Sequence, residues 1–299
     1  MLSPAHSPDD AWFEDLRVRE FARLDARGQA YLDYAGSALH AASQVRIYAA
    51  WLNEGVFGNP HSQHQASRDS TRVLDEARRA VLALFDVDET THILCFTANT
   101  SAAIKLVAES YPFGPARGLV LSADNHNSVN GVREFARAVG ATVTVLPLDA
   151  GLRLDDAAAR LQVAGRQGEG LFAFPAQSNF SGVRHPLALV EAAQAQGLDV
   201  LIDAAAACST PLSLKRCTAQ FAVVSFYKMF GLPTGVGALI ARRDALERLK
   251  RPWFAGGTVD FVSVQHGRHQ LRAGHEGFED GTPNFLGAGA IVPGLDLLT

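Results

Sequence analysis

A single lysine, Lys228, stands where an apolar run gives way to a glycine-rich loop. The run Phe221–Phe226 has the composition of a buried strand, and residues 231–237 contain three glycines and a proline. A lysine amine at such a place is costly to bury unless it is paired or covalently bound. Burial lowers its pKa, and the neutral amine can then form a Schiff base. From this segment alone, a solvent-exposed lysine in a turn is an equally good interpretation.

Four other polar segments also follow apolar runs. In Thr97–Ile104, small and hydroxyl residues open a helix whose free N–H groups could bind a phosphate. His126 could stack on a planar ring or transfer protons, and Asn179 and Gln177 offer neutral hydrogen bonds. Asp203 ends the apolar run before it, where a buried carboxylate needs a partner such as a protonated ring nitrogen.

Each of these segments also has a simpler interpretation. A Ser/Thr helix cap is commoner than a phosphate site, an aspartate often caps a helix, and Asn, Ser and Gly form turns. A loop histidine commonly bonds to the backbone. Together, however, a phosphate-binding turn, a ring-stacking histidine, a carboxylate for a ring nitrogen and a Schiff-base lysine are what pyridoxal 5'-phosphate requires. Because all four occur at strand ends in one order, the sequence predicts a site for this cofactor.

The rest of the chain explains how these residues could come together. Apolar segments alternate with helical ones, which predicts an α/β domain with a mostly parallel, seven-stranded sheet and helices on both faces. Ligands of such sheets bind beyond the carboxyl ends of the strands. A further short strand is expected at Tyr31–Ala38. The expected sheet strands are His92–Phe96, Leu119–Ser122, Thr142–Leu146, Leu171–Phe174, Val200–Asp203, Phe221–Phe226 and Val236–Ala241.

The domain organisation follows from the same pattern. We expect an N-terminal arm at residues 1–28, a large cofactor-binding domain at 29–286 and the start of a truncated C-terminal segment at 287–299. Helices are expected at Asp9–Leu24, Ala41–Asn53, Ser67–Phe85, Ser101–Glu109, Val129–Val139, Leu154–Gln162 and Leu187–Gln196.

Composition and charge exclude several classes of function. The 299 residues are 47% hydrophobic, enough for a large core, and the net charge of −4 gives no reason to expect nucleic acid or a membrane surface as a partner. The three cysteines, Cys95, Cys208 and Cys217, lack the spacing of a zinc site. Histidine pairs at i, i+3 have no third ligand, so no metal is expected. With no apolar run of ~18 residues and no signal peptide, we expect a cytoplasmic protein.

Eight segments carry a more specific signal. They are Tyr31–Gly36, Gly58–Ser62, Phe96–Ala98, Asp124–Val129, Pro175–Arg184, Ser225–Gly231, Gly256–Thr258 and Phe278–Thr282. In their order and their residues they resemble motifs of the class V, fold-type I pyridoxal-phosphate enzymes, the group that contains the cysteine desulfurases. Within this group, the resemblance is greatest to the aminotransferase-like domain of molybdenum cofactor sulfurases. The matching segments run from about residue 30 to about residue 286, and those around Asn179 and Lys228 are the most specific.

The resemblance implies a role for each residue near the cofactor ring. Lys228 would hold the cofactor as an internal aldimine and move the proton at the substrate α-carbon. Asp203 would pair with the pyridine nitrogen, and His126 would stack over the ring. Asn179 would contact the ring near its phenolic oxygen.

The resemblance likewise implies a set of phosphate-binding residues, two of them from the second subunit of a homodimer. Those of the same subunit would be Thr100, Ser101, Ser225 and Tyr227, and those of the other subunit Gly257 and Thr258. The chain departs from the family pattern at two places. It has Ala206 where many cysteine desulfurases have glutamine, and Asn99 where the phosphate loop usually has glycine.

The reaction that the resemblance implies is the mobilisation of sulfur from L-cysteine, with a protein or a cofactor as sulfur acceptor. In the family, a small C-terminal domain supplies the substrate-binding arginine and the cysteine that accepts sulfur, and we expect both to lie outside these 299 residues. None of the three cysteines is assigned that role. A class V aminotransferase, epimerase or C–S lyase stays open because the cofactor residues do not distinguish these reactions. A truncated, catalytically inactive binding or dimerisation module stays open as well.

Overall fold

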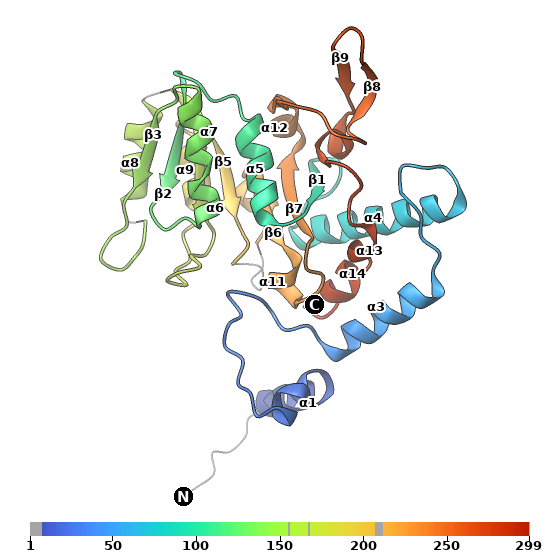
Figure 1. The fold of residues 1–299 in the computed structure, drawn as a ribbon. Coiled ribbons are helices and arrows are strands. Elements are labelled where there is room, and N and C mark those ends of the chain that lie inside the picture. Colours follow the sequence, from blue (N-terminus) through green and yellow to red (C-terminus); the bar gives the residue numbers. More distant parts are fainter. Residues whose placement is uncertain (1–7, 155, 167, 207–211, 299) are drawn as a thin grey trace, which may run out of the picture.

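A seven-stranded sheet forms the centre of the computed structural model, which describes residues 8–154, 156–166, 168–206 and 212–298 (Figure 1). The strand order is β1-β7-β6-β5-β4-β2-β3, and only β7 runs antiparallel to its neighbours. The predicted mostly parallel sheet and its seven strands are therefore confirmed. The strands are β1 His92–Thr97, β2 Arg117–Ser122, β3 Val143–Leu146, β4 Glu169–Pro175, β5 Leu198–Asp203, β6 Phe221–Ser225 and β7 Gly237–Arg242.

Side chains of the central strands alternate between two separate cores. In β4, Phe172 and Phe174 pack into one cluster, and Leu171 and Ala173 pack into the other. A strand that is covered by helices on both faces needs this near-continuous apolar composition. The expected helix at 129–139 is divided at Gly131. The helices around the sheet are α4 Gln65–Leu84, α5 Thr100–Ser110, α6 Asn127–Asn130, α7 Val132–Ala138, α8 Ala157–Gly165, α9 Ala188–Gln194, α10 Leu214–Cys217, α11 Phe226–Phe230 and α12 Arg243–Arg248.

The N-terminal part differs from the prediction at two places, the first being that the helix expected at Asp9–Leu24 is interrupted at Ala22. It contains α1 Pro8–Phe21, α2 Arg23–Ala26 and α3 Ala42–Glu54. The strand expected at Tyr31–Ala38 is wrong, because this segment is a loop with a turn in which the Tyr31 hydroxyl donates to the Ser37 carbonyl at 2.7 Å. The N–H of Ala38 donates to the carbonyl of Tyr227 at 3.2 Å. The small residues therefore let the loop approach the backbone beside Lys228 instead of joining the sheet.

The chain after α12 forms elements that the sequence pattern did not reveal. Figure 1 shows the hairpin of β8 and β9 projecting from the body of the molecule. Ile291 and Leu295, within the segment expected to begin a C-terminal unit, are buried in the core cluster that also contains side chains of α4 and α11. The domain boundary at residue 286 stays a prediction. The elements are β8 Val259–Ser263, β9 Arg268–Leu271, the 3-10 helix η1 Gly274–Phe278, α13 Phe285–Ala288 and α14 Ile291–Leu295.

A buried ion pair fixes the segment after η1 to the first strand. Both carboxylate oxygens of Glu279 lie 2.7 Å from Arg78 Nη2, and Oε1 also accepts from the Phe96 N–H at 2.7 Å. The Arg78 Nε–H donates to the Leu94 carbonyl at 3.2 Å. Both charged side chains are more than nine-tenths buried. Such a pair holds the C-terminal part firmly on β1, since separating the charges would leave one of them buried without its partner.

Candidate active site

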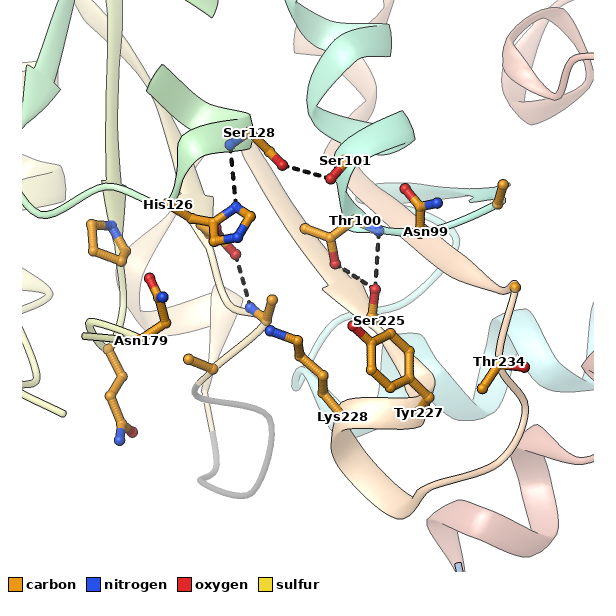
Figure 2. Close-up of a pocket in the computed structure, with 17 residues that line it drawn as sticks. Asn99, Thr100, Ser101, His126, Ser128, Asn179, Ser225, Tyr227, Lys228 and Thr234 are labelled. Carbon is orange, nitrogen blue, oxygen red and sulfur yellow. Dashed lines mark hydrogen bonds between the residues drawn. The ribbon is translucent and has the colours of Figure 1, made fainter. Parts of the chain in front are cut away.

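A cavity of about 410 Å³ opens at the carboxyl ends of the parallel strands. Every residue predicted to bind the cofactor lines it except Gly257 and Thr258. Figure 2 shows the arrangement, with the Lys228 side chain reaching toward His126. The convergence follows from topology, because parallel strands that end at the same edge of a sheet place their following loops side by side. The residues lining the cavity are Ala98, Asn99, Thr100, Ser101, His126, Ser128, Pro175, Gln177, Asn179, Asp203, Ala205, Ala206, Ser225, Tyr227, Lys228, Thr234 and Gly235.

The N-terminus of α5 lies on the wall of this cavity. The side chain of Asn99 accepts from the Ala102 N–H at 2.9 Å, and the Thr100 N–H donates to Ser225 Oγ at 3.0 Å. The hydroxyls of Thr100 and Ser225 lie 2.7 Å apart, and those of Ser101 and Ser128 lie 2.6 Å apart (Figure 2). A helix N-terminus with several hydroxyls beside it is suited to a phosphate.

Asn99 is compatible with this turn although the family pattern has glycine there. Its φ of −174° is extended backbone that any residue adopts. The close approach is made by Gly237 instead, because a Cβ at that position would lie 2.6 Å from the Asn99 carbonyl carbon. The glycine in β7 therefore makes room for the backbone of the phosphate loop.

Lys228 lies in the short helix α11, directly after β6. Gly231 ends this helix with a φ of +81°, and a Cβ there would lie 2.2 Å from the backbone nitrogen of His40. Only glycine fits this conformation and this close contact. The lysine-bearing turn is thus held between the sheet and the N-terminal loop, which directs the amine into the cavity.

Asp203 supplies a buried carboxylate at the end of β5. It is 6% exposed, and its Oδ1 accepts from the Ala205 N–H at 3.0 Å. Burial raises the pKa of Asp203, while the Ala205 hydrogen bond and the nearby charges of His126 and Lys228 act in the opposite direction. A carboxylate in this environment is stabilised by a ligand that brings a positively charged N–H group.

His126 and Asn179 come from the loops after β2 and β4. His126 caps α6, and its Nδ1 accepts from the Ser128 N–H at 3.2 Å. The turn around Asn179 is closed by the hydrogen bond from the Gly182 N–H to the Ser178 carbonyl, at 2.9 Å. Both side chains face the cavity (Figure 2), so a planar ring bound there would contact both.

Gly257 and Thr258 lie outside the cavity of their own chain. Thr258 is fully buried, and its hydroxyl donates to the Ala255 carbonyl at 2.8 Å. A Cβ on Gly257 would lie 3.1 Å from His61 Nε2. Their contact with a phosphate of a second subunit, which the resemblance implies, stays a prediction.

Sequence reasoning missed several residues of the cavity. Thr234 and Gly235 line it, although they lie in the loop after Lys228 where no residue type pointed to a ligand. Cys208 lies outside the described residues. Within the part of the chain that the structure describes, no group of three or more His, Cys, Asp or Glu residues could hold a metal ion. No helix of that part is long and apolar enough to cross a membrane.

The cavity fits pyridoxal 5'-phosphate at each end. The N-terminus of α5 suits its phosphate, the buried carboxylate of Asp203 suits its ring nitrogen, and the Lys228 amine can react with its aldehyde. The sheet and this set of residues define the large domain of a fold-type I pyridoxal-phosphate protein.

Comparison with known proteins identifies the family. The sequence model of the aminotransferase class-V family matches residues 30–299, and the chain belongs to this family. Pyridoxal 5'-phosphate is the cofactor that the family and the site indicate. Two solved structures have the same fold, the apo cysteine desulfurase of Thermococcus onnurineus NA1 (TM-score 0.84, 25% identity) and the cysteine desulfurase CsdA of Escherichia coli (TM-score 0.81, 26% identity). The matches cover 99% and 98% of this chain and 72% of each of those chains.

Curated relatives point to one branch of the family. The molybdenum cofactor sulfurase of Arabidopsis thaliana is 35% identical over 323 residues, and that of Homo sapiens is 36% identical over 301 residues. Each match covers 95% of this chain, but only 39% of the plant protein and 34% of the human protein. The chain thus corresponds to little more than a third of these relatives.

Proposed function

We propose that this chain uses pyridoxal 5'-phosphate, bound through Lys228, to mobilise sulfur from L-cysteine. The observation that carries the proposal is the convergence of Lys228, Asp203, His126 and the N-terminus of α5 in one cavity. The names of its relatives, cysteine desulfurase and molybdenum cofactor sulfurase, support sulfur as the group that is moved. When bound, the cofactor supplies an electron sink for charge that develops at the substrate α-carbon.

The residues around the ring would each contribute to that chemistry. The Lys228 amine holds the cofactor and afterwards moves the proton at the α-carbon. The Asp203 carboxylate keeps the proton on the ring nitrogen, because an anion in a buried site strongly favours its charged partner. His126 stacks on the ring, and Asn179 donates a hydrogen bond near the phenolic oxygen.

The phosphate would be held by both subunits of a homodimer. Thr100, Ser101, Ser225 and Tyr227 bind it from one subunit, and the segment with Gly257 and Thr258 binds it from the other. The position of the first four on the cavity wall supports this division.

Sulfur would leave L-cysteine for a thiol. The C–S bond of cysteine breaks, the sulfur forms a persulfide with the acceptor thiol, and protonation of the remaining carbon yields alanine, so no oxidant is needed. Cys95 and Cys217 are buried, and burial raises the pKa of both thiols, which keeps them protonated and unreactive. We therefore propose that the acceptor is a thiol of another segment, a protein or a cofactor, in the reducing cytoplasm.

Borohydride reduction followed by product analysis tests this function. Pyridoxal phosphate should be fixed on Lys228 in the wild type, lost in Lys228→Ala and retained in Lys250→Ala, a control at an exposed lysine. With L-cysteine and dithiothreitol as acceptor, the holoprotein should form alanine and sulfide in equal amounts. Pyruvate and ammonia would indicate a C–S lyase, transfer of the amino group to a keto acid an aminotransferase, and D-cysteine an epimerase. Cofactor binding without any product would favour a binding module.

A further inference from the structure

Asp124 and His185 form a buried pair beside the cavity, 61 residues apart in the chain. His185 Nε2 lies 2.8 Å from Asp124 Oδ2, and the two side chains are 0% and 5% exposed. The hydroxyl of Ser122 donates to the other carboxylate oxygen. Neither side chain lines the cavity, so any effect of the pair on a ligand must pass through other residues.

The pair connects the two loops that carry His126 and Asn179. Asp124 stands two residues before His126 in the loop after β2, and His185 stands six residues after Asn179 in the loop after β4. The N–H of His185 also donates to the Ala176 carbonyl at 3.1 Å, which fixes the imidazole close to the end of β4. This side-chain bond therefore joins the two loops, together with the hydrogen bond from Ser178 to Asp124 and the one from Asn125 Nδ2 to the Ala173 carbonyl, at 2.9 Å.

Hydrogen bonding favours the ionised form of the Asp124 carboxyl group. Burial alone would raise the pKa of Asp124, but hydrogen bonds from His185, Ser122 and Ser178 outweigh it and lower that pKa. An ionised carboxylate can only accept, so His185 Nε2 must carry a proton and donate it. A charge-assisted bond of this kind is stronger and more directional than a neutral one, which suits it to holding two loops in register.

We propose that Asp124 and His185 are positioning residues that hold His126 and Asn179 at the separation the cofactor ring requires. The inference rests on the proposed binding of pyridoxal phosphate in this cavity. Breaking the pair lets the two loops move apart, so the ring loses its stacking contact with His126. An aromatic contact of this kind corresponds to about a 2- to 10-fold change in affinity.

Two substitutions of one residue provide the test. In His185→Gln, the amide nitrogen reaches about as far as Nε2 and keeps the bond to Asp124. In His185→Asn, the side chain is equally polar but too short to reach. We expect the Asn variant to bind pyridoxal phosphate about 2- to 10-fold more weakly, with a reduced visible circular dichroism band, whereas the Gln variant resembles the wild type. Equal affinities and equal spectra for the two variants would overturn the proposal.

Further measurements separate this inference from the proposed function. If the wild type itself binds no cofactor, the proposed function fails. Crystal structures of the apoproteins then test whether Asp124 and His185 position His126 and Asn179. The Asn variant should show His126 and Asn179 displaced relative to each other, and the Gln variant should not. If His185→Asn does not fold, Asp124→Asn weakens the same bond from the other side, and unchanged cofactor affinity in that variant would refute the positioning role.

Discussion

Asp203→Asn is expected to stabilise the apoprotein while it weakens cofactor binding. The carboxylate is 6% exposed and accepts a hydrogen bond from the Ala205 N–H, which an asparagine oxygen can also accept. The substitution therefore removes a buried charge without removing the hydrogen bond. Leaving a buried polar group incompletely solvated costs about 1–3 kcal/mol, so we expect the free energy of unfolding at pH 8 to rise by about that amount.

The pH dependence of the stability difference shows whether the buried charge of Asp203 causes it. Burial raises the pKa of Asp203 in the folded state above its ordinary value of 3.8, so the folded protein favours the protonated acid. The carboxyl group favours folding at low pH, and this contribution is lost as the pH rises through the folded-state pKa. The advantage of the asparagine variant should therefore be largest at pH 8 and should shrink toward pH 5.

Urea denaturation of the apoproteins at the two pH values measures this effect. Asp260→Asn is the matched control, because Asp260 is 53% exposed and its substitution should change stability by no more than about 0.5 kcal/mol. With pyridoxal phosphate bound, the wild type should be more stable than the Asp203→Asn variant. Loss of the charged hydrogen bond to the ring nitrogen should weaken the variant's affinity for the cofactor roughly 10- to 100-fold. A less stable asparagine apoprotein at pH 8, or an equal gain at both pH values, would refute the reasoning.

Three further predictions follow from the buried charges and hydrogen bonds. Glu279→Ala should lower the free energy of unfolding by about 3 kcal/mol, because the buried Arg78 keeps only the partly exposed Asp75 as a charged partner. Glu276→Ala, at an exposed ion pair, should cost less than about 1 kcal/mol in the same urea titration. Ser225→Ala removes an acceptor from the N-terminus of α5 and should raise the dissociation constant for pyridoxal phosphate about 2- to 10-fold, measured by absorbance titration. Burial lowers the pKa of His275 to about 4, so stability should fall between pH 6.5 and about 4, and His275→Gln should abolish that part of the pH profile.

Local sequence patterns were sufficient to predict the seven strands of the central sheet and the polar residues that follow them, but not the hairpin of β8 and β9. Each sheet strand is an apolar run because both of its faces are covered, as Leu171 and Phe172 on opposite faces of β4 illustrate. The same reasoning failed at Tyr31–Ala38, where two aromatic residues and a leucine look like a strand but the chain docks on the turn that bears Lys228. The loop conformation of this segment depends on a tertiary contact, and no local sequence pattern encodes such a contact.

Residue type and position after an apolar run are local properties, so the amino-acid sequence was enough to identify residues that could bind one cofactor. Lys228, Asp203, His126 and Asn179 could all be named in this way. How these residues are held depends on contacts between segments that are far apart in the chain. The order of the strands brings their loops to one cavity, and the bond between Asp124 and His185 fixes two of those loops across 61 residues of chain. Such pairs are invisible in sequence, since each partner alone has the appearance of an ordinary loop residue.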